Sequence, residues 1–175
     1  MYTVIFGTMG AGKTSLLADK YLEGAGNCTV ILPEKCLKRH LFEGMNICSR
    51  NGKMVKVDLA IDSNYNLLQN TSQFKPTILV DEIQFLTRQQ HFDLSRLSKA
   101  PFNFKIFGYG LRNNFNLQMF KGSEYAVCVA DQVAILPSRC SVCEKSAVYD
   151  SLVSNDNDFI NATYASRCIE CFMQR

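Results

Sequence analysis

The sequence predicts an α/β fold in which a mostly parallel sheet has helices on both faces, followed by a small metal-binding module. Short apolar runs alternate with amphipathic stretches over residues 1–136, a glycine-rich turn joins the first two elements, and two cysteine pairs follow residue 137. The chain has 175 residues, of which 47% are hydrophobic and 20% charged, enough for one such domain and a small appendage. We therefore expect two domains, residues 1–136 and 137–175.

The elements of the first domain are expected where the hydrophobic pattern changes its period. A helix is expected over Lys13–Glu23, which Gly24 and Gly26 end, and another over 88–99, before the helix-breaking Pro101. Apolar runs rich in β-branched and aromatic residues predict strands at 3–6, 29–32, 54–60, 77–80, 104–107 and 127–129. Strands that are apolar throughout are typical of a parallel sheet that is buried on both faces.

Charge and hydropathy exclude several classes of partner. Nineteen Lys and Arg against sixteen Asp and Glu give a net charge of +3, which is too small and too scattered to predict a nucleic-acid or anionic-membrane partner. No apolar run reaches the roughly 18 residues that a membrane span needs. We expect a cytoplasmic protein whose eight cysteines are thiols or metal ligands. His40 and His91 have no accompanying motif and are expected at solvated positions.

Residues 7–14 form the pattern Gly-x-x-x-x-Gly-Lys-Thr between an apolar strand and a helical pattern, which is the context of a P-loop. Glycines let backbone N–H groups curve around phosphate oxygens, and the helix directs its positive end at them. Lys13 is expected to reach the β and γ phosphates, and Thr14 to offer a hydroxyl to Mg²⁺. The alternative is a glycine-rich turn with a chance lysine. The predicted nucleotide-binding residues are Gly7, Thr8, Met9, Gly10, Ala11, Gly12, Lys13 and Thr14.

Two carboxylates follow the expected strand at 77–80. Asp81 would emerge at the carboxyl edge of the sheet, where ligands bind, and is the predicted Mg²⁺ residue; the alternative is a capping Asp. Glu82 would orient a water in an ATPase, whereas in a kinase acting on a neutral alcohol it would accept the hydroxyl proton. An ordinary exposed carboxylate is the alternative for Glu82.

The second domain contains the pairs Cys140-x-x-Cys143 and Cys168-x-x-Cys171, with 24 residues between them. This spacing predicts a structural zinc site with four thiolate ligands, because four sulfurs leave no position for a catalytic water. The alternatives are four unrelated thiols or two redox pairs.

These motifs, in this order, resemble the type II thymidine kinases. The resemblance rests on the P-loop, on Asp-Glu-x-Gln-Phe at 81–85, on Gly110-Leu111 with Phe115 four residues beyond, and on the four-cysteine module. It implies a RecA-like P-loop domain and a zinc-anchored lasso. It also implies Mg²⁺-dependent transfer of the ATP γ-phosphoryl group to the 5′-hydroxyl of thymidine or deoxyuridine, in a homotetramer that serves pyrimidine salvage.

The resemblance also implies roles for particular residues. Glu82 would be the catalytic base, with Asp81 and Thr14 serving Mg²⁺. The residues that would contact the nucleoside are Met9, Phe85, Leu111, Phe115, Phe120 and Tyr164. Flat apolar walls of this kind suit a pyrimidine, although core packing is the alternative for any single Phe.

Two other functions compete with the kinase. One is an ATPase or nucleotide switch of a nucleic-acid machine whose zinc module grips DNA, and the other is a catalytically inactive nucleotide-binding subunit. The segment between the cysteine pairs has Glu144, Asp150, Asp156 and Asp158 against Lys145 and Arg167. Because this balance is acidic, it disfavours contact with a phosphate backbone, and we expect no nucleic-acid partner.

Overall fold

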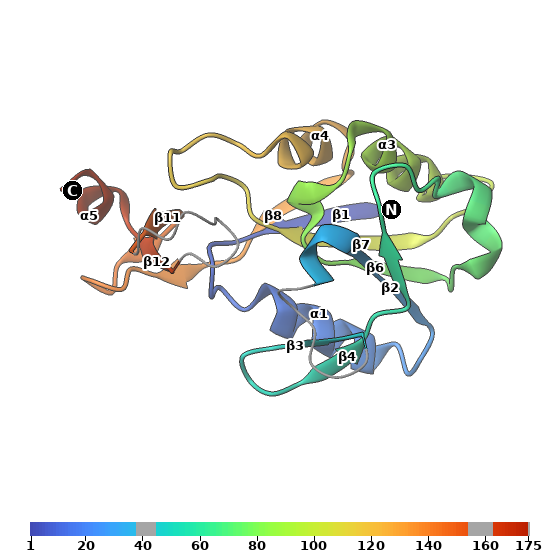
Figure 1. Ribbon diagram of the computed structural model, residues 1–175, viewed down its shortest axis with the longest axis horizontal. Coiled ribbons are helices and arrows are strands. Elements are labelled where there is room, and N and C mark those ends of the chain that lie inside the picture. The colour runs from blue at the N-terminus through green and yellow to red at the C-terminus, as the bar shows by residue number, and fades with distance from the viewer. Residues whose placement is uncertain (38–44, 154–162, 175) are drawn as a thin grey trace.

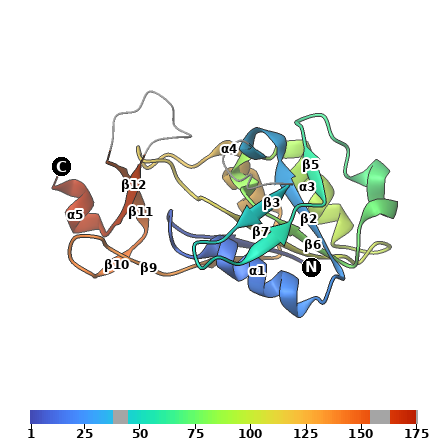
Figure 2. The same cartoon turned by 60° about the horizontal axis from the view of Figure 1, so that its bottom comes forward.

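The computed structural model describes residues 1–37, 45–153 and 163–174, and its centre is a six-stranded sheet (Figures 1 and 2). The strand order is β5-β2-β6-β7-β1-β8, and each pair of neighbours is parallel. The strands are β1 (Tyr2–Phe6), β2 (Cys28–Pro33), β5 (Leu59–Ile61), β6 (Thr77–Val80), β7 (Lys105–Gly110) and β8 (Gln132–Ile135). The predicted parallel α/β sheet is confirmed.

Helices cover both faces of this sheet (Figure 1). On one face lie α1 (Lys13–Glu23) and a hairpin of β3 (Asn46–Cys48) and β4 (Met54–Lys56), and on the other lie α3 (Arg88–Leu97) and α4 (Lys121–Val129). Short 3-10 turns are η1 (Glu34–Cys36), η2 (Leu68–Gln73) and η3 (Ile83–Phe85).

The core consists of one apolar layer on each face of the sheet. Along β1, Val4 and Phe6 pack in the layer that contains Leu94 of α3, whereas Ile5 packs with Leu17 of α1. This is the period-2 alternation of a strand, with both faces apolar because both are covered. Two buried layers anchor the loops at the carboxyl edge of the sheet.

Two of the expected strands are wrong. The run 127–129 is the last turn of α4, because Gly122, Ser123 and Ala126 form a small-residue face buried against the neighbouring turn; a Cβ on Gly122 would lie 2.5 Å from the carbonyl oxygen of Gln84. The run 54–60 divides into β4 and β5, since the chain leaves the hairpin and joins β2 where Val30 donates to Asp58 at 2.9 Å.

The expectation for His91 is also wrong, while His40 lies outside the described residues. His91 is fully buried in α3, with Nδ1 3.1 Å from the Tyr2 hydroxyl and Nε2 3.1 Å from the Ile83 carbonyl oxygen. Burial lowers the pKa of this imidazole to about 4, so the ring is neutral in the fold. The helix that holds it begins with a capping box between Thr87 and Gln90.

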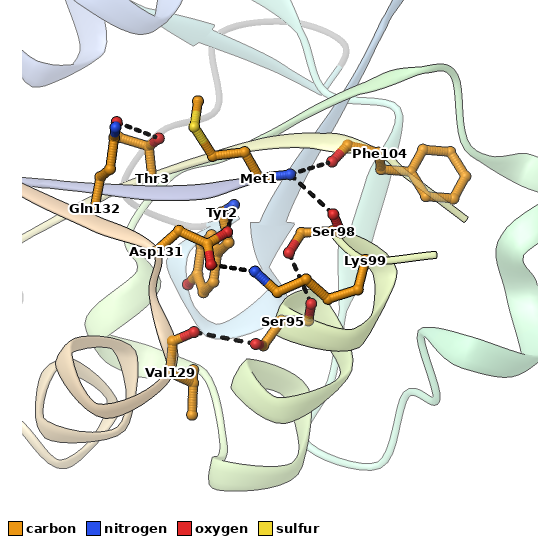
Figure 3. A network of polar contacts seen from close by, with 10 residues as sticks. All are labelled: Met1, Tyr2, Thr3, Ser95, Ser98, Lys99, Phe104, Val129, Asp131 and Gln132. Carbon is orange, nitrogen blue, oxygen red and sulfur yellow. Dashed lines mark hydrogen bonds and ion pairs between the residues drawn. The ribbon is translucent and has the colours of Figure 1, made fainter. Parts of the chain in front are cut away.

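The amino end of β1 is closed by a polar network, which we call the amino-end network (Figure 3). The Met1 ammonium donates to the carbonyl oxygens of Ser98 at 2.9 Å and Phe104 at 3.2 Å. The Tyr2 N–H donates to Asp131 at 2.7 Å, and Asp131 also pairs with Lys99. These contacts join β1 to the end of α3 and to the segment after α4.

The C-terminal module lies beyond the carboxyl end of β1 (Figures 1 and 2). It contains two antiparallel pairs, β9 (Ser138–Arg139) with β10 (Ser146–Ala147) and β11 (Tyr149–Leu152) with β12 (Tyr164–Arg167), and the short helix α5 (Ile169–Met173). The domain boundary after residue 136 stays a prediction. In the part of the chain that the structure describes, no helix is long and apolar enough to cross a membrane.

Candidate active site

The glycine-rich turn at 7–14 joins the carboxyl end of β1 to the first residue of α1. Gly10 and Gly12 have φ of 86° and 87°, in the left-handed region that glycine adopts without a Cβ penalty. Lys13 Nζ lies back across the turn and donates to the carbonyl oxygens of Gly7 at 3.0 Å and Thr8 at 2.8 Å. Burial lowers the pKa of Lys13, against the opposing charges of Glu82 and Asp81. The geometry is that of a P-loop.

The two predicted Mg²⁺ residues lie side by side. Asp81 follows β6 and is 1% exposed, and the Thr14 hydroxyl donates to its Oδ2 at 3.3 Å. The N–H of Glu82 donates to Asp81 Oδ1 at 3.0 Å. A hydroxyl and a carboxylate at this spacing are the oxygen ligands that suit Mg²⁺ beside a phosphate site.

Glu82 adopts a backbone conformation that is uncommon for its type, with φ of 54° and ψ of 41°. A non-glycine residue here costs of the order of 1–3 kcal/mol and is found most often at functional sites. The side chain is held by Gln84, whose amide nitrogen donates to Glu82 Oε2 and whose Oε1 accepts from the Leu111 N–H at 3.0 Å. Gln84 belongs to the motif at 81–85 but was not predicted as a site residue; its amide fixes the Glu82 carboxylate relative to Leu111.

Beside the glycine-rich turn is a cavity of about 290 Å³, which we call the cradle cavity. Its lining includes Lys13, Thr14, Asp81 and Glu82, and also Arg50. Arg50 lies so close to the turn that a Cβ on Gly10 would be 2.6 Å from its Nη1. This second cation was not predicted as a site residue.

A second cavity, of about 380 Å³, is mostly apolar, and we call it the aromatic cavity. Phe85 and Phe120 meet edge to face with ring centroids 5.9 Å apart, and Phe115 and Tyr164 lie 6.3 Å apart and tilted. All six residues predicted to contact a nucleoside line this cavity: Met9, Phe85, Leu111, Phe115, Phe120 and Tyr164. The polar residues of its lining were not predicted as site residues: Lys35, Asn113, Asn114 and Asp150.

The two cavities adjoin. Met9 and Leu111 line both of them, and Glu82 lines the cradle cavity beside these shared residues. A phosphate donor in one cavity and a flat acceptor in the other would therefore meet next to the Glu82 carboxylate.

The four cysteines of the C-terminal module converge. The sulfur atoms of Cys140, Cys143, Cys168 and Cys171 all lie within 4.8 Å of one another, and those of Cys143 and Cys168 are 3.5 Å apart. Tetrahedral zinc with Zn–S bonds of about 2.3 Å requires sulfurs about 3.8 Å apart, so this set fits the ion. The N–H of Cys168 lowers the pKa of the Cys140 thiol, which favours the thiolate that a metal needs.

A P-loop, an acidic strand end and an adjoining aromatic cavity define a P-loop phosphotransferase with a separate acceptor site. Comparison with known proteins identifies its family. The family model for thymidine kinase matches residues 1–172, so the chain belongs to the thymidine kinase family.

Individual relatives agree with the family model. A thymidine kinase from Streptococcus pyogenes serotype M3 is 30% identical over 156 residues, which cover 86% of this chain and 80% of the relative. One from Streptococcus agalactiae serotype Ia is 31% identical over 147 residues, covering 81% of this chain and 76% of the relative. One from Streptococcus gordonii is 29% identical over 148 residues, covering 81% and 75%. The predicted thymidine kinase function is confirmed, and no match favours a nucleic-acid machine.

Proposed function

We propose that Glu82 is the general base for transfer of the γ-phosphoryl group of ATP to the 5′-hydroxyl of thymidine or deoxyuridine. The observation that supports this role is the junction of the two cavities, where Glu82 lies beside Met9 and Leu111. A sugar hydroxyl is neutral at pH 7, so it attacks phosphorus far better when a positioned carboxylate accepts its proton. Gln84 holds that carboxylate in place from the Leu111 side.

The cradle cavity would bind the triphosphate. The start of α1 at the end of the glycine-rich turn would offer backbone N–H groups to phosphate oxygens, and Lys13 and Arg50 would supply positive charge. Thr14 and Asp81 would hold Mg²⁺, which when bound neutralises charge on the β and γ phosphates. Lys13 would exchange its two loop carbonyls for phosphate oxygens.

The aromatic cavity would bind the nucleoside. The rings of Phe85, Phe115, Phe120 and Tyr164 give a pyrimidine flat apolar contacts, and Leu111 and Met9 close the side toward the cradle cavity. Walls of this kind exclude water from the transferring group, which disfavours hydrolysis of ATP.

The four cysteines would hold a structural zinc ion. Among the described residues the module buries few apolar side chains of its own, with Cys140, Ala147 and Cys168 as its buried cluster. A Cys₄ zinc site can contribute on the order of 10 kcal/mol, enough to stabilise so small a module. The site therefore supports β11 and β12, which supply Asp150 and Tyr164 to the aromatic cavity.

We further propose a homotetramer in the cytoplasm, on the family resemblance and on the need for reduced thiolates at the zinc site. Sedimentation velocity on the zinc-loaded protein would test the assembly, and a monomer or dimer would contradict it.

The assignment of Glu82 is tested by a transfer assay with ATP, Mg²⁺ and a panel of nucleosides. Thymidine and deoxyuridine should give their 5′-monophosphates, and Glu82→Gln should abolish most turnover while leaving the affinity for ATP within about twofold. ATP hydrolysis without a nucleoside product would contradict the proposal, as would a Glu82→Gln variant with wild-type turnover.

A further inference from the structure

The C-terminal module holds the backbone of Met9 from both sides. The Met9 N–H donates to both carboxylate oxygens of Asp150, at 2.9 and 3.0 Å. The Ser166 hydroxyl oxygen lies 3.0 Å from the Met9 carbonyl oxygen and 2.8 Å from the hydroxyl of Thr8. We call Asp150 and Ser166 together the Met9 clasp.

The strand register explains why these two residues act on one backbone unit. Asp150 of β11 is paired directly with Ser166 of β12, and residues paired in this way present their side chains on the same face of the ribbon. That face is turned to the glycine-rich turn, where Thr8 also donates to Ser138 of β9 at 2.7 Å. Three strands of the module thus contact two consecutive residues of the P-loop.

Burying the carboxylate of Asp150 is energetically unfavourable. This residue is 7% exposed, and burial raises the pKa of its carboxyl to about 6 against the opposing effects of the Met9 N–H and Lys13. Two oxygens on a single N–H fix the direction of that N–H more narrowly than one acceptor would. The cost of burying the carboxylate is understandable if the orientation of Met9 matters to the reaction.

Met9 is where such an orientation would act, because it lines both the cradle cavity and the aromatic cavity. We propose that Asp150 and Ser166 are positioning residues that set Met9 and thereby align the bound nucleoside with the phosphoryl donor. This inference rests on the proposed function. It gives the C-terminal module a role in phosphoryl transfer that needs no contact between the module and the transferred group.

The test compares Asp150→Ala and Ser166→Ala with wild type, measuring kcat, the KM for ATP, the KM for thymidine and the zinc content per chain. Each variant should lose about tenfold in kcat, because misalignment of bound reactants slows chemistry more than binding. The KM for ATP should stay within about twofold in both variants, and so should the KM for thymidine in Ser166→Ala, because Asp150 lines the aromatic cavity and Ser166 does not. The zinc content should not change. Since both residues act through Met9, the double variant should lose less than the product of the single losses.

Two further variants separate positioning from general damage. Asp150→Asn keeps an oxygen for the Met9 N–H and should retain most of kcat. Ser141→Ala removes an exposed hydroxyl that bonds the Ser166 carbonyl oxygen at 3.2 Å within the module, and it should behave as wild type. If Asp150→Ala fails to fold, Ser166→Ala still decides the question, because a tenfold loss of kcat supports the inference and wild-type kcat overturns it.

Wild-type kcat in Ser166→Ala and in folded Asp150→Ala would overturn the inference, as would a loss of kcat that merely follows a loss of zinc. Failure of the proposed function would instead appear in the wild-type chain, as an absence of thymidine monophosphate.

Discussion

The two ends of the central sheet use charged groups in opposite ways. At the amino end, the charged groups of the amino-end network are paired within the fold (Figure 3). The Met1 ammonium donates to two backbone carbonyl oxygens, and Lys99 forms an ion pair with Asp131. At the carboxyl end, Lys13, Arg50, Asp81 and Glu82 surround the cradle cavity instead. In parallel α/β sheets the carboxyl end faces the starts of helices, so ligands bind there.

The charged residues that stabilise the fold and those that line the candidate active site therefore lie at opposite ends of the same strands. A substitution at the amino end should change the free energy of unfolding and leave turnover alone, whereas one among the charged groups of the cradle cavity should lower turnover with little change in the free energy of unfolding.

The largest effect is expected for Glu82→Gln. Removing a general base typically lowers turnover by about 10²- to 10⁴-fold, and the amide has the size and backbone of the original residue. The melting temperature should stay within about 1 °C, since the side chain is half-buried and Gln84 can still donate to its oxygen. A large loss of stability together with a small loss of kcat would break the separation.

Arg50→Ala should come next. Arg50 lines the cavity that we propose binds the triphosphate, so its deletion should remove stabilisation of the transferring phosphoryl group, and we expect about a hundredfold loss in kcat/KM for ATP. Arg50→Lys should restore part of this loss, because a point charge replaces only part of a planar fork of donors. Transfer assays at several ATP concentrations would measure kcat/KM for Arg50→Ala and Arg50→Lys. Equal values in wild type and in both variants would exclude a catalytic role for Arg50.

Asp150 lies at the carboxyl end but outside the cradle cavity, and it marks the limit of this separation, because Asp150→Asn should stabilise the fold. The folded-state pKa of Asp150 is about 6, above the ordinary value near 4, so protonation stabilises the fold below about pH 4 and this contribution is lost as pH rises through 6. At pH 7 the neutral amide should therefore be more stable than the carboxylate by about 3 kcal/mol, because each of the two pKa units corresponds to about 1.36 kcal/mol.

Denaturant titrations of wild type and Asp150→Asn at pH 4, 5, 6 and 7 would measure this difference. It should grow from near zero at pH 4 to its full value at pH 7. His91 is present in both proteins, so its own titration cancels from the comparison. A difference that is constant with pH would mean that the carboxylate is not disfavoured by burial.

The smallest effect is expected for Asp131→Asn at the amino end. The variant loses the ion pair with Lys99 but keeps an oxygen for the Tyr2 N–H, and partly exposed pairs contribute about 0.5–1 kcal/mol. These two contacts lower the pKa of Asp131, so the difference from wild type should disappear in acid as the carboxylate is protonated. Turnover of Asp131→Asn should equal that of wild type in the same transfer assay.

The sequence predicted what local patterns encode. The helix Lys13–Glu23 and the strand Thr77–Val80 are found as expected, because the glycine-rich turn and a fully apolar run fix their ends. The cysteine spacing likewise predicted that four sulfurs would converge.

Contacts between distant segments could not be predicted in this way. The helix α4 depends on Gly122 packing against the backbone of Gln84, and Asp150 reaches Met9 across 141 positions of sequence. Arg50 and Asp150 lie in segments whose composition resembles any polar loop or short edge strand, so only the folded arrangement identifies them as site residues. The predicted roles of the individual site residues stay predictions until the variants above are measured.

The imidazole of His91 links the two ends of the sheet. A carbonyl oxygen can only accept, so Nε2 must donate to Ile83, and Nδ1 then accepts from the Tyr2 hydroxyl. The ring thus connects the first strand to the residue that follows Glu82. Because it stays uncharged down to about pH 4, mild acid stress in a cell does not reach this connection. The hydrogen bond that holds the turn after Glu82 should therefore persist when the pH falls to about 5.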